Sequence, residues 1–169
     1  MPLAISGRIS DDAWREEVIN RLRAASPKAD ARGAVAGWSA SPGAINQPVL
    51  DLLRQRRVPV ALVTSATSRL PQDLAAPGLD GEFDHIINSS RIGVAKPDPG
   101  IFVAALQALD LPACQVLFID DDVRHVAAAT KLGIRSCQFQ GDVMDMAEIL
   151  GRDRLLRDEI FVRCRAPKA

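Results

Sequence analysis

The chain has 169 residues, of which 47% are hydrophobic and 25% are charged, so it is long enough for one globular domain and is not disordered. Lys plus Arg and Asp plus Glu each total 21, and this zero net charge favours neither nucleic acid nor an anionic membrane as a partner. No apolar run approaches 18 residues and no basic-then-apolar leader is present, so neither a membrane span nor a signal peptide is expected. The three cysteines form neither a zinc spacing nor a disulfide framework, which is typical of the reduced cytoplasm.

The first part of the chain predicts two helices joined by a loop. Ser10 is a good helix cap followed by acidic residues, and the apolar positions after it predict a helix that ends near Ala25. Residues 26–44 hold five glycines and prolines among small residues, which predicts a loop or linker. A second helix is expected from Pro48 to the basic residues at 54–57.

Strands and helices alternate in the rest of the chain. Apolar runs predict strands at 58–63, 85–87, 116–119 and 134–139. Helices are expected between them and after the last strand, at about 68–77, 100–109, 123–132 and 143–150. This alternation predicts βαβ units, and so a Rossmann-like three-layer α/β/α fold around a mostly parallel sheet.

Three carboxylates directly follow the apolar run at 116–119. Asp120, Asp121 and Asp122 repel one another at the end of a buried strand, and their hard oxygen ligands suit Mg²⁺. We therefore predict a magnesium site formed by Asp120 and Asp121. The alternative is that one aspartate caps the helix that follows while the others are solvated.

Two further groups of polar residues are predicted at the same rim of the sheet. Thr64 and Ser65 follow the strand at 58–63, and Lys96 opens a proline-rich turn before the helix at 100–109. Each group alone is more typical of an ordinary turn or a solvated loop. Together with the carboxylates they provide hydroxyl donors, a cation and a metal site, which is the set that orients and neutralises a phosphoryl group.

Three segments resemble the second, third and fourth motifs of haloacid dehalogenase-like (HAD) hydrolases, in the family's order. They are VALVTSATSRL at 60–70, GVAKPDPGIF at 93–102, and the run from 116 to 133 that begins VLFIDDD. The resemblance covers roughly residues 8–150. A receiver domain of two-component signalling also combines paired Asp, Thr or Ser, and Lys. In that domain, however, the acidic pair comes first in the chain, whereas here it comes last.

The resemblance implies Mg²⁺-dependent phosphatase chemistry through an aspartyl intermediate, with a small phosphorylated metabolite as ligand. Thr64 would bind the transferring phosphoryl group and Lys96 would neutralise it, so both are implied catalytic residues, with Ser65 as a further substrate-binding residue. Asp120 and Asp121 would hold the Mg²⁺. Ser65 and His125 stand where many relatives have Asn, which leaves the substrate open.

The family's first motif, a strand ending in Asp-x-Asp that supplies the nucleophile, has no counterpart before Thr64. We therefore expect residues 1–44 to be the remnant of a helical cap and its linker, 45–150 the core without its first central strand, and 151–169 a tail. The chain is expected to be a truncation, a misassigned start or a natural remnant with impaired hydrolase activity. The alternative is a non-catalytic phosphate- or Mg²⁺-binding module, or a protein-interaction module, on the same scaffold.

In the family the missing strand lies between the strands that end at Thr64 and Asp120. Its absence would leave two unpaired strand edges. We expect closure of the sheet, a partner chain such as a second copy in a homodimer, or another segment to cover them. Residues 159–164 have the composition of a strand, although a helix end with a frayed tail is at least as well supported.

Overall fold

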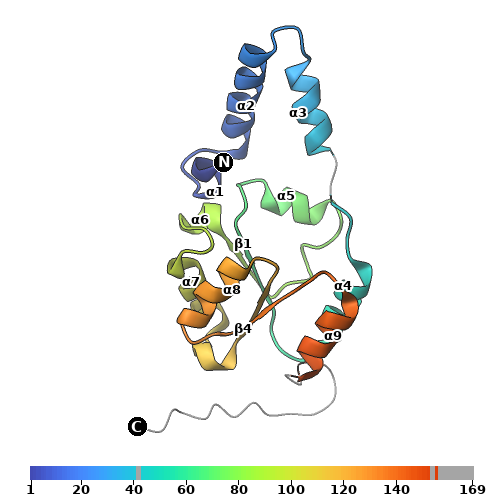
Figure 1. Ribbon diagram of the computed structural model, residues 1–169, viewed down its shortest axis with the longest axis vertical. Helices are drawn as coiled ribbons and strands as arrows, with labels where there is room; N and C mark the ends of the chain where they lie inside the picture. The colour runs from blue at the N-terminus through green and yellow to red at the C-terminus, as the bar shows by residue number, and fades with distance from the viewer. Residues whose placement is uncertain (41–42, 153–154, 156–169) are drawn as a thin grey trace.

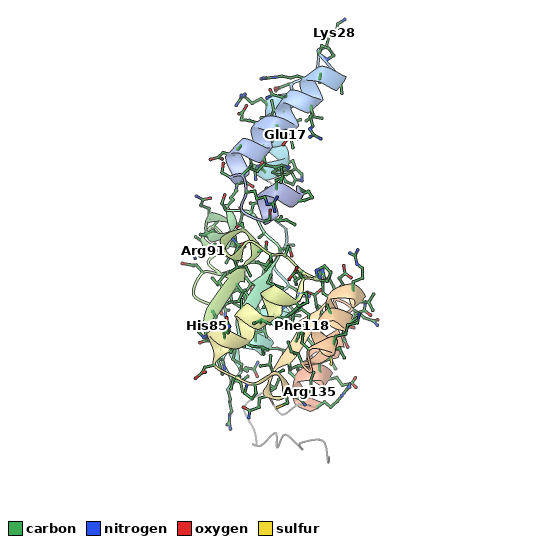
Figure 2. The ribbon with its side chains drawn as sticks, turned by 90° about the vertical axis from the view of Figure 1, so that its left-hand side faces the viewer. Glu17, Lys28, His85, Arg91, Phe118 and Arg135 are labelled. Carbon is green, nitrogen blue, oxygen red and sulfur yellow. The ribbon has the colours of Figure 1, made fainter. Side chains whose placement is uncertain are left out.

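The computed structural model describes residues 1–40, 43–152 and 155. Its N-terminal part is a helical hairpin, which packs against one end of an α/β core (Figure 1). The short helix α1 (Pro2–Ile5) precedes the hairpin helices α2 (Asp11–Ala25) and α3 (Ala31–Ser39). Figure 2 shows the hairpin projecting from the core with Lys28 at its tip. The Ser10 side chain accepts a hydrogen bond from the Ala13 N–H, as expected for the cap of the predicted first helix.

The prediction of a linker over residues 26–44 is wrong, because α3 lies within it. The Asp30 side chain accepts a hydrogen bond from the Gly33 N–H and so caps α3. Ala31 and Val35 then pack against Ile19 of α2 in a small core of their own. Glycine costs about 1 kcal/mol in a helix, and this burial offsets it.

The core follows the predicted alternation of strands and helices, and only its first and last strands are shorter than expected. Its elements are α4 (Gln47–Arg54), β1 (Ala61–Thr64), α5 (Leu70–Ala75), β2 (His85–Asn88), α6 (Ser89–Ile92), α7 (Pro99–Leu109), the 3₁₀ turn η1 (Ala113–Gln115), β3 (Leu117–Asp120), α8 (Val123–Lys131), β4 (Arg135–Gln138) and α9 (Val143–Arg152). The sequence pattern missed only the two shortest α-helices of the described chain, α1 and α6, besides α3.

The strands lie between two layers of helices, which confirms the predicted α/β class (Figure 1). Helix α7 packs on β1 and β2, and α8 packs on β3 and β4. Helices α4 and α9 pack on each other on the opposite side. Ile101 and Phe102 of α7 are fully buried in the main core, where the Phe102 ring meets Phe118 of β3 edge to face at 5.1 Å between centroids.

The prediction that the strands at 58–63 and 116–119 belong to one sheet is wrong for the part of the chain that the structure describes. β1 pairs in parallel with β2, and β3 pairs in parallel with β4, so two separate two-stranded sheets result. All of β1 and the first three residues of β3 are only half-buried, although their apolar composition is that of core strands. One edge of β1 and one edge of β3 therefore lack a partner strand among the described residues.

Two smaller findings concern the cysteines and the helices. Cys137 is a free thiol. No described helix is long and apolar enough to cross a membrane. The strand-like segment at 159–164 lies outside the described residues.

Candidate phosphoryl-binding site

Lys96 connects the ends of the two sheets. Its backbone N–H donates to the Ser65 Oγ just after β1 at 3.0 Å, and its Nζ donates to the Asp120 Oδ2 at the end of β3 at 2.6 Å. The local fold places it there, because α6 ends at Gly93 in a left-handed conformation (φ 86°) and α7 starts at its cap Asp98. One residue thus brings the carboxyl ends of both sheets to a common point.

Asp120 is the most enclosed group of this cluster, with only 6% of its side chain exposed. Besides the contact with Lys96, its Oδ1 accepts from the Asp122 N–H at 2.9 Å and lies 2.9 Å from the His125 Nδ1. Both carboxylate oxygens are therefore engaged by groups of the chain itself. Lys96 is also well enclosed, at 13% exposure, so the two form a nearly buried ion pair.

These contacts decide the ionisation of Asp120. Burial raises the pKa of its carboxyl, but the hydrogen bonds from Lys96, the Asp122 N–H and His125 lower it by more, so the pKa lies below the usual 3.8. Since the folded-state pKa is the depressed one, this carboxylate stabilises the fold above pH 3.8, and the contribution is lost as the pH falls through the folded-state value.

We therefore expect the chain to lose part of its stability in acid through Asp120. Denaturant unfolding at pH 7 and at pH 3 should show a smaller free energy of unfolding at the lower pH. The Asp120→Asn variant should show a weaker pH dependence, because its amide does not titrate. An identical pH dependence in the variant would contradict this assignment.

Thr64 and Asp121 flank this cluster and make fewer contacts. Thr64 is paired in register with Asn88, and its hydroxyl has no hydrogen-bond partner in the part of the chain that the structure describes. The Asp121 side chain is exposed and likewise makes no hydrogen bond to a described residue. Asp122 accepts from the backbone N–H and the side chain of Arg124, so it is the helix cap considered as the alternative.

Sequence reasoning did not include His125 in the site. It lies in the first turn of α8, five residues after Asp120, and that turn points its ring back at the strand end. The signal available in the sequence was a histidine close behind an acidic cluster, which could have indicated a contact with the carboxylates. Of the predicted residues, the structure joins Ser65, Lys96 and Asp120 through direct contacts and leaves Thr64 and Asp121 beside them.

The residues present do not form a closed metal site. Among residues 1–40, 43–152 and 155, no group of three or more His, Cys, Asp or Glu side chains could hold a metal ion. Lys96 and His125 already contact the carboxylate of Asp120, so a metal ion would have to compete with them for its oxygens. Mg²⁺ commonly uses one or two protein carboxylates together with water and phosphate oxygens. The pair Asp120 and Asp121 could thus supply only part of such a site, and tight binding of Mg²⁺ does not fit this arrangement.

Comparison with known proteins places most of the chain in one family. A model of the haloacid dehalogenase-like hydrolases matches residues 12–133. The haloacid dehalogenase-like hydrolase domain-containing protein 3 of Xenopus laevis is 32% identical over 100 residues, which are 59% of this chain and 40% of that protein. The GMP/IMP nucleotidase YrfG of Escherichia coli is 33% identical over 91 residues, which are 53% of this chain and 41% of that protein. The chain thus spans about two fifths of these curated relatives.

Solved structures agree at the level of the fold. A HAD-like hydrolase structure from Porphyromonas gingivalis has a TM-score of 0.67 at 23% identity, covering 93% of this chain and 78% of that one. A HAD family enzyme from Bacteroides thetaiotaomicron, solved with magnesium and inorganic phosphate, has a TM-score of 0.65 at 22% identity, covering 82% and 73%. The match over residues 12–133 and this shared fold show that the chain belongs to the haloacid dehalogenase-like hydrolase family.

Proposed function

We propose that the chain carries the phosphoryl-binding part of a phosphatase-type HAD hydrolase and binds inorganic phosphate or a small phosphorylated metabolite. The observation that supports this most is the position of Lys96, which holds the end of β1 and the end of β3 together at one rim. Ligands of open α/β folds bind beyond the carboxyl ends of the strands. The GMP/IMP nucleotidase among the relatives acts on phosphate esters, which agrees with this class of ligand.

Each side chain then has a defined task. The Thr64 hydroxyl, which no described group occupies, donates to a phosphoryl oxygen, and the Lys96 ammonium neutralises its charge. Asp120 orients Lys96, while Ser65 fixes its backbone. No attacking carboxylate precedes Thr64 at a strand end in these 169 residues. Turnover therefore needs a nucleophile that the described site does not provide, and a well-studied hydrolase without its nucleophile loses about 10⁶ in turnover.

A second candidate function, a binding module without catalysis, is favoured by the contacts of Asp120. Its carboxylate is already neutralised by Lys96 and contacted by His125, as in a structural ion pair. A phosphatase assay on the purified chain, with and without Mg²⁺, separates the two functions. Mg²⁺-dependent release of phosphate supports the hydrolase, and phosphate binding without release supports the module.

We also propose that Asp120 and Asp121 bind Mg²⁺ weakly, because two carboxylates at a strand end attract a hard cation even when one is paired. Calorimetric titration of the chain with Mg²⁺ should give heat that the Asp120→Asn variant removes. Asp80→Asn is the matched control, because Asp80 is exposed and makes no hydrogen bond to a described residue. Equal titrations for the chain and Asp120→Asn would refute the metal assignment, and loss of heat in Asp80→Asn would show nonspecific binding.

A further inference from the structure

Asp11 is a buried carboxylate at the junction between the hairpin and the core. It is the first residue of α2 and is only 5% exposed. Its Oδ1 accepts from the Thr67 Oγ1 at 2.7 Å, its Oδ2 pairs with the Arg15 guanidinium, and its backbone N–H donates to the Ser68 Oγ at 3.0 Å. A carboxylate that merely favours a helix N-terminus needs neither of the long-range contacts, with Thr67 and Ser68.

Two partners of Asp11, Thr67 and Ser68, belong to the β1–α5 loop (residues 65–69), which directly follows Thr64. The core side of the same loop is also held by side chains. The Asn88 amide donates to the Thr67 carbonyl at 3.0 Å, and the Ser89 hydroxyl donates to the Ala66 carbonyl at 3.2 Å. Asn88 and Ser89 are almost fully buried. The loop is thus held by the end of β2 and the start of α6 on one side and by Asp11 on the other.

Arg15 extends the contact into the hairpin. Its guanidinium carbon lies 5.4 Å from the centre of the Trp38 ring on α3, and Trp38 meets Trp14 of α2 edge to face at 6.0 Å. A continuous path therefore leads from the β1–α5 loop through Asp11 and Arg15 to both hairpin helices. Arg15 also lines a pocket of about 510 Å³ between α2 and α3, to which Arg69 of the loop contributes.

The backbone before α2 is held against the core as well. Gly7 has a φ of 71°, and a Cβ at this position would lie 2.0 Å from the Ser90 carbonyl oxygen. Only glycine permits this approach, so the segment that leads into Asp11 is positioned before the helix begins.

We propose that Asp11 is a positioning residue, which fastens the hairpin to the β1–α5 loop and thereby holds Thr64 and Ser65 in the conformation that binds phosphate. The phosphate part of this proposal rests on the proposed function, whereas the fastening does not. The hairpin and the phosphoryl site are then coupled through one carboxylate, and loosening Asp11 weakens phosphate binding without removing any group that touches phosphate.

Two matched pairs of variants test the fastening by amide hydrogen exchange. Asp11→Ala is compared with Asp12→Ala, which removes an exposed carboxylate from the same helix turn. Thr67→Val is compared with Thr67→Ser, which keeps the hydroxyl. We expect exchange over residues 65–70 to rise roughly 10- to 100-fold in Asp11→Ala and Thr67→Val relative to α7, the range for a hydrogen bond to a charged group. In the double variant Asp11→Ala/Thr67→Val, exchange over these residues should be only slightly faster than in either single variant, because both changes remove the same contact.

The outcomes separate the fastening from a general effect on stability. Faster exchange throughout the core, including α7, or equal effects of Asp11→Ala and Asp12→Ala, would overturn the proposal. If Asp11→Ala does not fold, the comparison of Thr67→Val with Thr67→Ser tests the fastening by itself. Inorganic phosphate titrated into the folded variants should bind at least about tenfold more weakly to Asp11→Ala and Thr67→Val than to their controls. A parent chain that binds no phosphate would refute the proposed function, and the exchange data would still decide the fastening.

Discussion

A chain extended ahead of Met1 by a strand-forming segment that ends in Asp-x-Asp is expected to be more stable and to hydrolyse phosphate esters. One edge of β1 and one edge of β3 have no partner strand among the described residues, and both strands are mostly half-buried. Each unpaired buried backbone group costs roughly 1–3 kcal/mol, whereas whole domains are stable by only about 5–15 kcal/mol. A strand that pairs with both edges should therefore give a large gain, and its first Asp would face Lys96.

Two measurements on two extended chains check this expectation. The first chain carries Asp-x-Asp, and the control carries Asn-x-Asn in an otherwise identical segment. Both should melt at a higher temperature than the parent, because both supply the strand. Only the first should show Mg²⁺-dependent phosphatase activity, with a difference that approaches the roughly 10⁶-fold effect of a nucleophile. Sedimentation should show a parent that self-associates through its open edges and extended chains that do so less.

A parent chain that sediments as a stable monomer, with no gain in melting temperature or activity on extension, would contradict this interpretation. The two sheets would then be stable as they are. The ion pair of Lys96 and Asp120 would in that case be a structural contact, and the binding module would be the better description of the chain.

The sequence predicted most elements of the core because their signals are local. The strands are apolar runs, and helices such as α2 and α7 have recognisable caps in Ser10 and Asp98. The failure at α3 has a physical reason. Its glycines and the neighbouring prolines predict a loop, but Val35 packs against Ile19 of α2, and burial against a distant segment is invisible in a local window. Likewise, no local pattern indicates which strands pair.

The same distinction between local signals and tertiary contacts applies to the residues of the candidate site. Thr64, Ser65, Lys96, Asp120 and Asp121 were predicted because they stand at the ends of apolar runs or in a proline turn, in the order of a known family. His125 and Asp11 were not assigned, because their roles come from tertiary contacts with Asp120 and Thr67. Asp11 in particular has the sequence signature of an ordinary helix start, and only its burial sets it apart from the exposed Asp12.

The Lys96→Met variant is expected to be the most destabilising single change at the site. Methionine keeps the length and apolar stem of lysine but leaves the Asp120 carboxylate, at 6% exposure, without its cation. Breaking a buried ion pair in this way typically costs about 3–5 kcal/mol in the free energy of unfolding. The change should be measured by denaturant unfolding, with Lys28→Met as the control, because Lys28 lies exposed at the hairpin tip (Figure 2).

The same variant should move the affinities for two ions in opposite directions. Without the ammonium, phosphate loses its main positive partner and should bind more weakly. Mg²⁺ should bind more tightly, since an Asp120 oxygen is released and a neighbouring positive charge is gone. General destabilisation would weaken the binding of both phosphate and Mg²⁺. Changes of opposite sign would therefore show that the charge of Lys96 itself favours phosphate and disfavours Mg²⁺. Calorimetric titrations of folded Lys96→Met and Lys28→Met with each ion decide the matter, and parallel losses for both ions in Lys96→Met would refute it.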